Sequence, residues 1–379
     1  MRSLLVLIDG LGDEPIPGWK GLTPFQKAQH NNIDKLLDGK VAAEISICEN
    51  DIIPESCSCI LRLLGVKNNY IPQSRSYLEL LAHNRDISEF EMVLRCNLVA
   101  VNENNIMTAF NGTGLNIIEM QEAAAVCNDI LKEIEFIHLS EYRNLMILNR
   151  EQRVLNCHVP PPHENVGENI YSLLTELMQN SLAMKYFLEV AEQRLQKFSR
   201  NGLRYMLYPW GAADRCVLPS FFELHHLKGA AVCKAEIVAG IATALGMQVE
   251  IPANATGDID TDINAKTTAA LNLLQENDFV IAHFNGSDEA SHRYYAEGKQ
   301  HFIEKIDEHF LGRIMREYHE PLKIVVCGDH VTSSVSGKHG RGAVPVVAGS
   351  INCSMQDINI NININSYKDI LNFLMRESD

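Results

Sequence analysis

Four short, almost entirely apolar runs constrain the fold of this chain more than any other feature. They are SLLVLI (3–8), DFVIAHF (278–284), KIVVC (323–327) and AVPVVAG (343–349). Strands of this kind are buried on both faces, as in a parallel sheet. Helical patterns alternate with these runs, at 24–37, 56–64, 168–198, 233–245, 261–275, 297–318 and 366–376. The alternation predicts an α/β fold, in which helices sandwich a mainly parallel sheet.

The stretch from residue 70 to residue 167 has a different pattern. Its predicted elements are strands at 91–101, 135–139 and 142–149 and an amphipathic helix at 115–134. The Pro-rich segment CHVPPPHENVG (157–167) is typical of a connection. We therefore expect a smaller α+β domain, residues 70–167, inserted into a core domain made of residues 1–69 and 168–379.

Charge and composition narrow the classes of partner. The 379 residues include 33 basic and 48 acidic side chains, which gives a net charge of −15. An acidic surface argues against binding to nucleic acid, because phosphate neutralisation needs a basic face. A metal ion or a few arginines can still reverse the field locally, so a small anionic substrate remains possible. No apolar stretch approaches the ~18 residues of a membrane span, so we expect no membrane partner.

The cysteines and the N-terminus indicate the cellular compartment. Ten cysteines are scattered along the chain without a C-x-x-C pair. The first apolar run meets Asp9 after six residues, which favours a buried strand over a signal peptide. We therefore expect reduced thiols and a cytoplasmic location. The sequence leaves the oligomeric state open.

Carboxylates and imidazoles gather at or just beyond the ends of the predicted strands. Open α/β sheets bind their ligands at this edge. One of these side chains, Asp9, directly follows the first strand, and Asp288 and His292 are spaced to share one face of a helix. The full set is Asp9, Asp288, His292, Asp329, His330 and His339. Each of these residues alone is equally compatible with a turn or a helix cap.

Taken together, the three carboxylates and three imidazoles predict a metal centre. This mixture of ligands suits Zn, Mn or similar ions. Six ligands are more than one ion needs if it keeps a position open for substrate. Adjacent side chains point in different directions, so Asp329 with His330 is better suited to two ions than to one. We therefore predict two metal ions.

A nucleophile is expected beside such a centre, and Ser56 is the candidate. It lies in IIPESCSCILRLLG, where a helix is predicted to begin. An N-cap is the ordinary role of such a serine. The same position is favourable for a phosphate group, and a metal-bound hydroxyl can lose its proton near neutral pH. The rival nucleophile is Cys57, but no histidine or other base motif adjoins it.

The chain resembles the cofactor-independent phosphoglycerate mutases of the short, archaeal type, which belong to the alkaline phosphatase superfamily. The resemblance extends through nearly the whole chain. It is carried by LLVLIDGLGDEPIPGWKGLTPFQKA, SCSCILRLLG, LRCNLVAV, PPHENVG, YPWGAADRCVLPSF, ANATGDIDTDINAK, NGSDEASH, CGDH and GKHGRGAVP. It implies an alkaline-phosphatase-like core and a reaction of glycolysis and gluconeogenesis, the interconversion of 3- and 2-phosphoglycerate.

The resemblance also implies roles for individual residues. Ser56 would accept the phosphoryl group as phosphoserine, with two divalent ions (Mn, Zn, Mg or Co) and without 2,3-bisphosphoglycerate. One ion would be held by Asp9, Ser56, Asp329 and His330, and the other by Asp288, His292 and His339. The inserted domain would hold the glycerate and close over the metals. The substrate contacts implied are Arg95, Arg75, Arg143 and Lys266.

Four positions depart from the family pattern without removing a ligand. They are Glu55, Cys57, Glu91 and Asn285. Two alternatives therefore stay open beside the mutase. One is a phosphomonoesterase or phosphonate hydrolase that uses the same serine and metals, and the other is a catalytically inactive binding protein.

Overall fold

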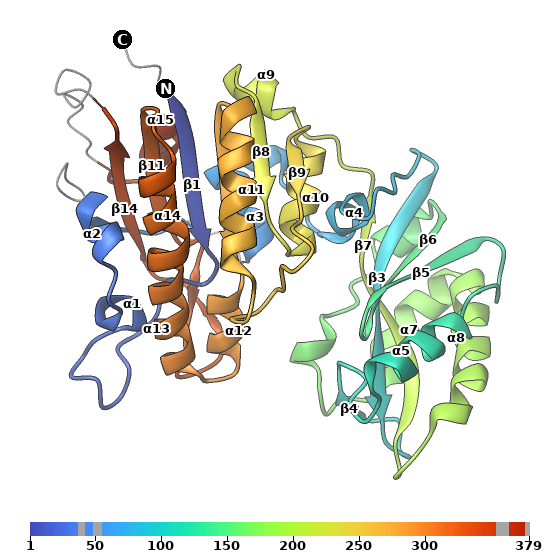
Figure 1. Ribbon diagram of the computed structural model, residues 1–379. Helices are drawn as coiled ribbons and strands as arrows, with labels where there is room; N and C mark the ends of the chain where they lie inside the picture. The colour runs from blue at the N-terminus through green and yellow to red at the C-terminus, as the bar shows by residue number, and fades with distance from the viewer. Residues whose placement is uncertain (37–41, 48–54, 354–363, 376–379) are drawn as a thin grey trace. The chain divides into compact units, whose positions relative to one another are not determined.

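The computed structural model describes residues 1–36, 42–47, 55–353 and 364–375. The chain divides into two compact units, of which the larger comprises Met1–Ile71 with Val217–Asp379 and the smaller comprises Pro72–Cys216. Residues 168–216, expected in the core domain, thus belong to the smaller unit. The reason is the strand β7 (Arg204–Asp214), which pairs with β3 (Glu91–Val101) in the smaller unit's sheet (Figure 1).

The larger unit is built on a sheet of seven strands in the described part of the chain. In spatial order they are β2 (Ala42–Ile45), β14 (Val344–Ile351), β11 (Leu322–Cys327), β1 (Arg2–Ile8), β10 (Phe279–Phe284), β8 (Gly229–Val232) and β9 (Gln248–Glu250). The strands from β11 to β9 run parallel, and β14 and β2 are antiparallel to their neighbours. The prediction of a mainly parallel α/β sheet is confirmed.

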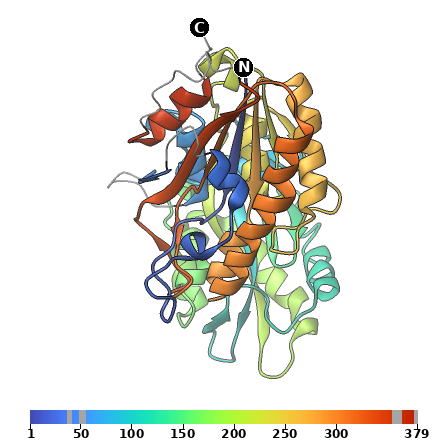
Figure 2. The ribbon, with the colours of Figure 1, turned by 60° about the vertical axis from the view of Figure 1, so that its left-hand side comes forward.

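Helices cover both faces of this sheet. One layer contains α1 (Pro24–Lys27), α2 (Asn31–Leu36), α11 (Ile263–Glu276), α13 (Ala296–Lys305), the π-helical segment η5 (Ile306–Leu311) and α14 (Gly312–Glu317). The other contains α3 (Ser56–Leu63), α10 (Glu236–Ala244) and α15 (Tyr367–Met375). Figure 2 shows the orange helices on one side of the sheet and the red α15 on the other. The remaining elements are η2 (Asn68–Tyr70), α9 (Phe221–His225), α12 (Gly286–His292), β12 (Val331–Thr332) and β13 (His339–Gly340).

The apolar runs become the buried centre of the larger unit. On β1, Leu4, Val6 and Ile8 face one layer of helices and lie in the same cluster as Phe284 and Phe310. Phe284 and Phe310 meet edge to face, with ring centroids 5.0 Å apart. The intervening residues of β1 are also buried, so both faces of the strand are covered. Within the described residues, no helix combines the length and hydrophobicity that crossing a membrane requires.

The smaller unit has an antiparallel sheet with helices packed against it. Its elements are α4 (Ser76–Leu81), β3, β4 (Met107–Ala109), α5 (Ile117–Ala125), β5 (Ile134–Ser140), β6 (Arg143–Asn149), α6 (Gln152–Leu155), η3 (Pro162–Glu164), α7 (Ile170–Asn180), α8 (Leu182–Leu195), η4 (Gln196–Phe198) and β7. The helix predicted at 168–198 is two helices, because Ser181 is extended and caps the second with its side chain. The helix predicted at 115–134 ends early, at Ala125.

Candidate metal centre

The parallel strands β1, β10 and β11 bring the predicted ligands to one edge of the sheet. The register pairs β1 with β10 on one side and with β11 on the other, so the three strands end together. Asp9 follows β1 directly, Asp288 lies on α12 beyond β10, and Asp329 follows β11 after one glycine. Asp9 is 2% exposed and Asp329 1% exposed. Segments far apart in sequence therefore place three carboxylates together.

One group of possible ligands consists of Asp9, Asp329 and His330, whose ligand atoms lie within 4.8 Å of one another. The Nε2 atom of His330 is 3.4 Å from Asp9 Oδ1 and 3.4 Å from Asp329 Oδ2. Ser56 joins this group, because its Oγ lies 3.2 Å from His330 Nε2 and 3.4 Å from Asp9 Oδ1. The four residues expected around the first ion are thus neighbours.

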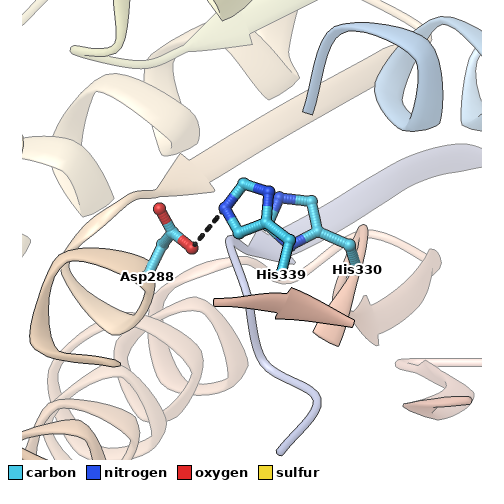
Figure 3. Close-up of side chains that lie close together, drawn as sticks. All are labelled: Asp288, His330 and His339. Atoms are coloured by element: carbon cyan, nitrogen blue, oxygen red, sulfur yellow. Dashed lines mark ion pairs between the residues drawn. The ribbon is translucent and has the colours of Figure 1, made fainter. Parts of the chain in front are cut away.

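A second group consists of Asp288, His330 and His339 (Figure 3). His339 Nε2 lies 3.5 Å from Asp288 Oδ1, and the ring of His330 is beside that of His339. His292 Nε2 is 3.2 Å from Asp288 Oδ2 and 3.2 Å from His339 Nε2. The other nitrogen of His292 donates to the carbonyl of Gly337, so Nε2 is the nitrogen that can bind an ion once its proton is released.

The charge balance of this cluster fits a bound cation. Asp329 Oδ1 accepts hydrogen bonds from the amides of Gly10 and His330, but its buried Oδ2 accepts none from the described residues. Burial raises the pKa of Asp9 well above its usual value, and the charges of Asp329 and Asp288 raise it further. Buried carboxylates that crowd in this way need positive charge. Divalent cations supply it, and the mixture of carboxylate and imidazole suits them.

The histidine pKa values are shifted in opposite directions in this cluster. Burial lowers the pKa of His330, so its ring is neutral and able to bind a metal. The hydrogen bond with Asp288 raises the pKa of His292 to about 9, against the effect of burial. Burial would raise the pKa of Asp288, but hydrogen bonds from His292 and His339 outweigh it and hold the pKa well below its usual value. A cation at this group therefore competes with a proton, and its binding releases that proton.

Two supporting groups were not predicted from the sequence. His283, on β10, is fully buried, and its Nε2 lies 3.1 Å from Asp9 Oδ2, whereas the contact of His330 is with Oδ1. Burial lowers the pKa of His283 to about 3, so the neutral ring donates to the carboxylate. Lys299 forms a buried ion pair with Asp13 at 2.9 Å. The only hint of His283 in the sequence is a polar side chain inside an apolar run.

The three arginines predicted to contact substrate lie together in the smaller unit. Arg95 and Arg75 each place Nε 2.9 Å from a different oxygen of Glu79. The guanidinium of Arg95 also lies over the ring of Trp210, 4.1 Å from its centroid. Burial lowers the pKa of Arg95 to about 10, and the positive charges of Arg75 and Arg143 lower it further. Two guanidiniums thus share a single carboxylate, and the charge of Arg143 acts on Arg95 as well, so positive charge exceeds negative charge locally in an acidic chain.

Lys266 lies elsewhere, in the larger unit. It is 1% exposed, and its ammonium donates to the carbonyl of His283 at 2.9 Å. Burial lowers the pKa of Lys266 to about 8. The side chain is therefore placed to support the end of β10, and direct contact with a substrate requires it to leave this buried position.

Comparison with known proteins agrees with the class that the fold and the site define, an α/β metalloenzyme. Residues 1–364 match the model of the Metalloenzyme superfamily. A 2,3-bisphosphoglycerate-independent phosphoglycerate mutase from Saccharolobus islandicus is 30% identical over 366 residues, which cover 91% of this chain and 87% of that protein. A protein of the same name from Metallosphaera sedula is 29% identical, with the same coverage.

Solved structures share the fold. A protein from Pyrococcus horikoshii has a TM-score of 0.73 and 24% identity, over 92% of this chain and 87% of that chain. The cofactor-independent phosphoglycerate mutase from Thermoplasma acidophilum has a TM-score of 0.57 and 22% identity, over 98% of each chain. The chain belongs to the Metalloenzyme superfamily and, within it, to the family of 2,3-bisphosphoglycerate-independent phosphoglycerate mutases.

Proposed function

We propose that this chain interconverts 3-phosphoglycerate and 2-phosphoglycerate through a phosphoserine at Ser56, without 2,3-bisphosphoglycerate. Membership of the mutase family supports the substrate, and the position of Ser56 supports the mechanism. Two divalent ions, drawn from Mn, Zn, Mg and Co, complete the centre. The ligand types are compatible with all four.

The observation that carries this proposal is the position of the Ser56 hydroxyl. It lies within 3.4 Å of both Asp9 and His330, at the first residue of α3. The amides at the start of that helix favour an anionic phosphoryl group. A phosphate that approached Ser56 would therefore meet the cluster of metal ligands and the positive end of a helix dipole together.

Each set of side chains then has one task. Asp9, Asp329 and His330 would hold one ion beside Ser56, and Asp288, His292 and His339 would hold the other. Bound there, the ions would neutralise phosphate charge and ease loss of the Ser56 proton. Ser56 Oγ forms a bond to phosphorus as the bond from phosphorus to the 3-oxygen of glycerate breaks, and that oxygen takes up a proton. In the second transfer the 2-hydroxyl loses its proton and takes the phosphoryl group, so Ser56 is restored.

The arginines of the smaller unit supply the recognition of anionic groups. The substrate carries a carboxylate and a phosphate, and guanidinium groups bind both in a bidentate manner. We propose that Arg75, Arg95 and Arg143 bind these groups. Because both transfers happen on one glycerate, the product of the first transfer has to stay bound until the second.

The test is a coupled mutase assay on metal-loaded protein, run beside a measurement of free phosphate. Ser56→Ala should lower turnover by at least about a thousandfold. Ser58→Ala is the matched control, since that hydroxyl lies on the same helix and donates to the Glu55 carbonyl at 3.1 Å. Acid quenching should trap a phosphoryl group on Ser56. A Ser56→Ala variant with normal turnover would contradict the mechanism.

A second outcome of the same assay separates the mutase from a hydrolase. Glu55, Cys57 and Asn285 depart from the family pattern near the nucleophile or the metal ligands. Cys57 is buried, and the side-chain amide of Asn285 donates to the Gly257 carbonyl at 3.0 Å. Phosphate release without interconversion of the two phosphoglycerates would favour the phosphomonoesterase over the mutase.

A further inference from the structure

Thr332 lies between the two groups of metal ligands and belongs to neither. It is the second residue of β12 and is 0% exposed. Its amide donates to the carbonyl of Gly12 at 3.0 Å, and its own carbonyl accepts from Lys299 Nζ at 3.0 Å. Both main-chain groups are therefore anchored outside the site, which fixes the direction of the side chain.

The hydroxyl of Thr332 contacts Asp288, which belongs to the second group, and His330, which belongs to both groups. Its Oγ1 lies 2.6 Å from Asp288 Oδ1 and 3.1 Å from His330 Nδ1. A carboxylate only accepts hydrogen bonds, so the single hydroxyl proton goes to Asp288. Oγ1 is then left as an acceptor, and His330 must donate to it from Nδ1. This arrangement leaves the lone pair of His330 on Nε2, which faces Asp9 and Ser56.

We propose that the Thr332 hydroxyl is a positioning group that couples the two metal sites. It orients the Asp288 carboxylate and selects the tautomer of His330 whose Nε2 can bind a metal. This inference rests on the proposed two-metal centre, but it assigns a role to a residue that is itself no ligand. Partners that orient metal ligands in this way commonly control metal affinity.

The packing around this hydroxyl supports a specific role. A Cβ atom at Gly10 would lie 2.6 Å from Thr332 Oγ1 and 2.8 Å from Asp288 Oδ1. Gly10 also has a φ of +60°, a conformation that residues with a Cβ rarely adopt. The turn after Asp9 thus lies directly against the bond between Thr332 and Asp288. Glycine at this position leaves room for that bond and for the amide of Gly10 to reach Asp329.

The test compares three variants of the full chain. Thr332→Val keeps the shape of the side chain and removes the hydroxyl, and Thr332→Ser restores the hydroxyl. Thr267→Val is the matched control, because that threonine is also fully buried but its hydroxyl lies near the carbonyls of Ile263 and His309. The measurement is equilibrium binding of Mn²⁺ to the metal-free proteins, with the number of ions and both dissociation constants determined.

We expect Thr332→Val to lower the affinity for both Mn²⁺ ions by about 10- to 100-fold. The loss of a partner that orients metal ligands has an effect of this size in other metal sites. Thr332→Ser should bind Mn²⁺ with dissociation constants within a few-fold of those of wild type. Thr267→Val should bind Mn²⁺ as wild type does, even if it unfolds at a lower temperature. Normal binding of both ions by Thr332→Val would overturn the inference. So would an equal loss of affinity in Thr267→Val, because the effect would then come from general destabilisation.

A second measurement is made on the wild-type protein and does not require any Thr332 variant to fold. Nitrogen-15 NMR of histidine-labelled, metal-free wild type reports which ring nitrogen of His330 carries the proton, with His330→Gln used for assignment. We expect the proton on Nδ1, and a proton on Nε2 would overturn the inference. Failure of the proposed function has a different signature, since wild type would then bind two ions and show this tautomer but not interconvert phosphoglycerates.

Discussion

The ion pair between Lys299 and Asp13 is expected to be the most sensitive support of the metal centre. Both side chains are 0% exposed, and Nζ lies 2.9 Å from Asp13 Oδ2. The same ammonium donates to the carbonyls of Gly12 at 3.1 Å and Thr332 at 3.0 Å. Asp13 accepts in addition from the amide and the hydroxyl of Ser334. The Lys299 ammonium therefore joins the loop after β1 to the segment that carries Thr332.

The cost of removing that cation follows from burial. Lys299→Met leaves a buried carboxylate without its cation, which costs about 3–5 kcal/mol of the free energy of unfolding. Each carbonyl that loses its donor adds about 1 kcal/mol. With two carbonyls affected, a total of about 5–7 kcal/mol is a large fraction of the stability of an ordinary domain. Replacing Asp13 by Asn in the same chain removes the stranded charge, so the double variant should be more stable than Lys299→Met alone.

The assay is urea unfolding of the metal-free wild type, the two single variants and the double variant. Such a cycle isolates the coupling between the two side chains, because they are in direct contact. We expect a coupling free energy of at least about 2 kcal/mol. A cost below about 1 kcal/mol for Lys299→Met, or strictly additive effects, would refute the argument that the pair is buried and coupled.

Three further predictions concern substitutions of the charged side chains Lys266, Arg95 and Asp329. Burial lowers the pKa of Lys266 from 10.5 to about 8, so its charge destabilises the folded chain below pH 8 and progressively less as the pH rises toward 10.5. Lys266→Met should therefore unfold at higher urea than wild type at pH 7, an advantage that disappears near pH 10.5. Arg95→Lys should raise KM for phosphoglycerate about tenfold, because lysine lacks the bidentate fork, whereas exposed Arg85→Lys should not. Asp329→Asn should raise the melting temperature of the metal-free protein and reduce the further rise that Mn²⁺ produces in wild type, because one of the two ions loses a ligand.

The sequence indicated which carboxylates and imidazoles would lie together, for a physical reason. Asp9 and Asp329 each lie at the end of an apolar run, and parallel neighbours in one sheet must end at one edge. The spacing of Asp288 and His292 likewise places both on one face of a short helix, and the structure has them 3.2 Å apart. Strand ends and helix spacing are local properties, so a single sequence displays them.

The domain boundary was not visible in the same way. The helices α7 and α8 have the apolar spacing of any helix that packs on a sheet, and nothing in that spacing says which sheet. Their assignment depends on β7, which pairs with β3 across more than a hundred residues of sequence. Pairing at such separation is decided by the packed fold rather than by local preference. For the same reason the sequence gave only a hint of His283, a polar side chain inside an apolar run, and none of Thr332, because their roles depend on neighbours brought from other strands.

The charge of the centre explains why these supporting groups are needed. Three carboxylates lie close together, and burial, followed by the charges of Asp329 and Asp288, raises the pKa of Asp9 in the folded chain. Two neutral groups, His283 and Thr332, each donate a proton to one of those carboxylates, which lowers the repulsion without adding a cation that would compete with the metals. Two buried ammonium groups lie nearby: Asp13 balances that of Lys299, and burial lowers the pKa of Lys266, beside the carbonyl of His283, to about 8. The surroundings therefore keep the negative charge of the site available for divalent ions, at the expense of stability in the metal-free state.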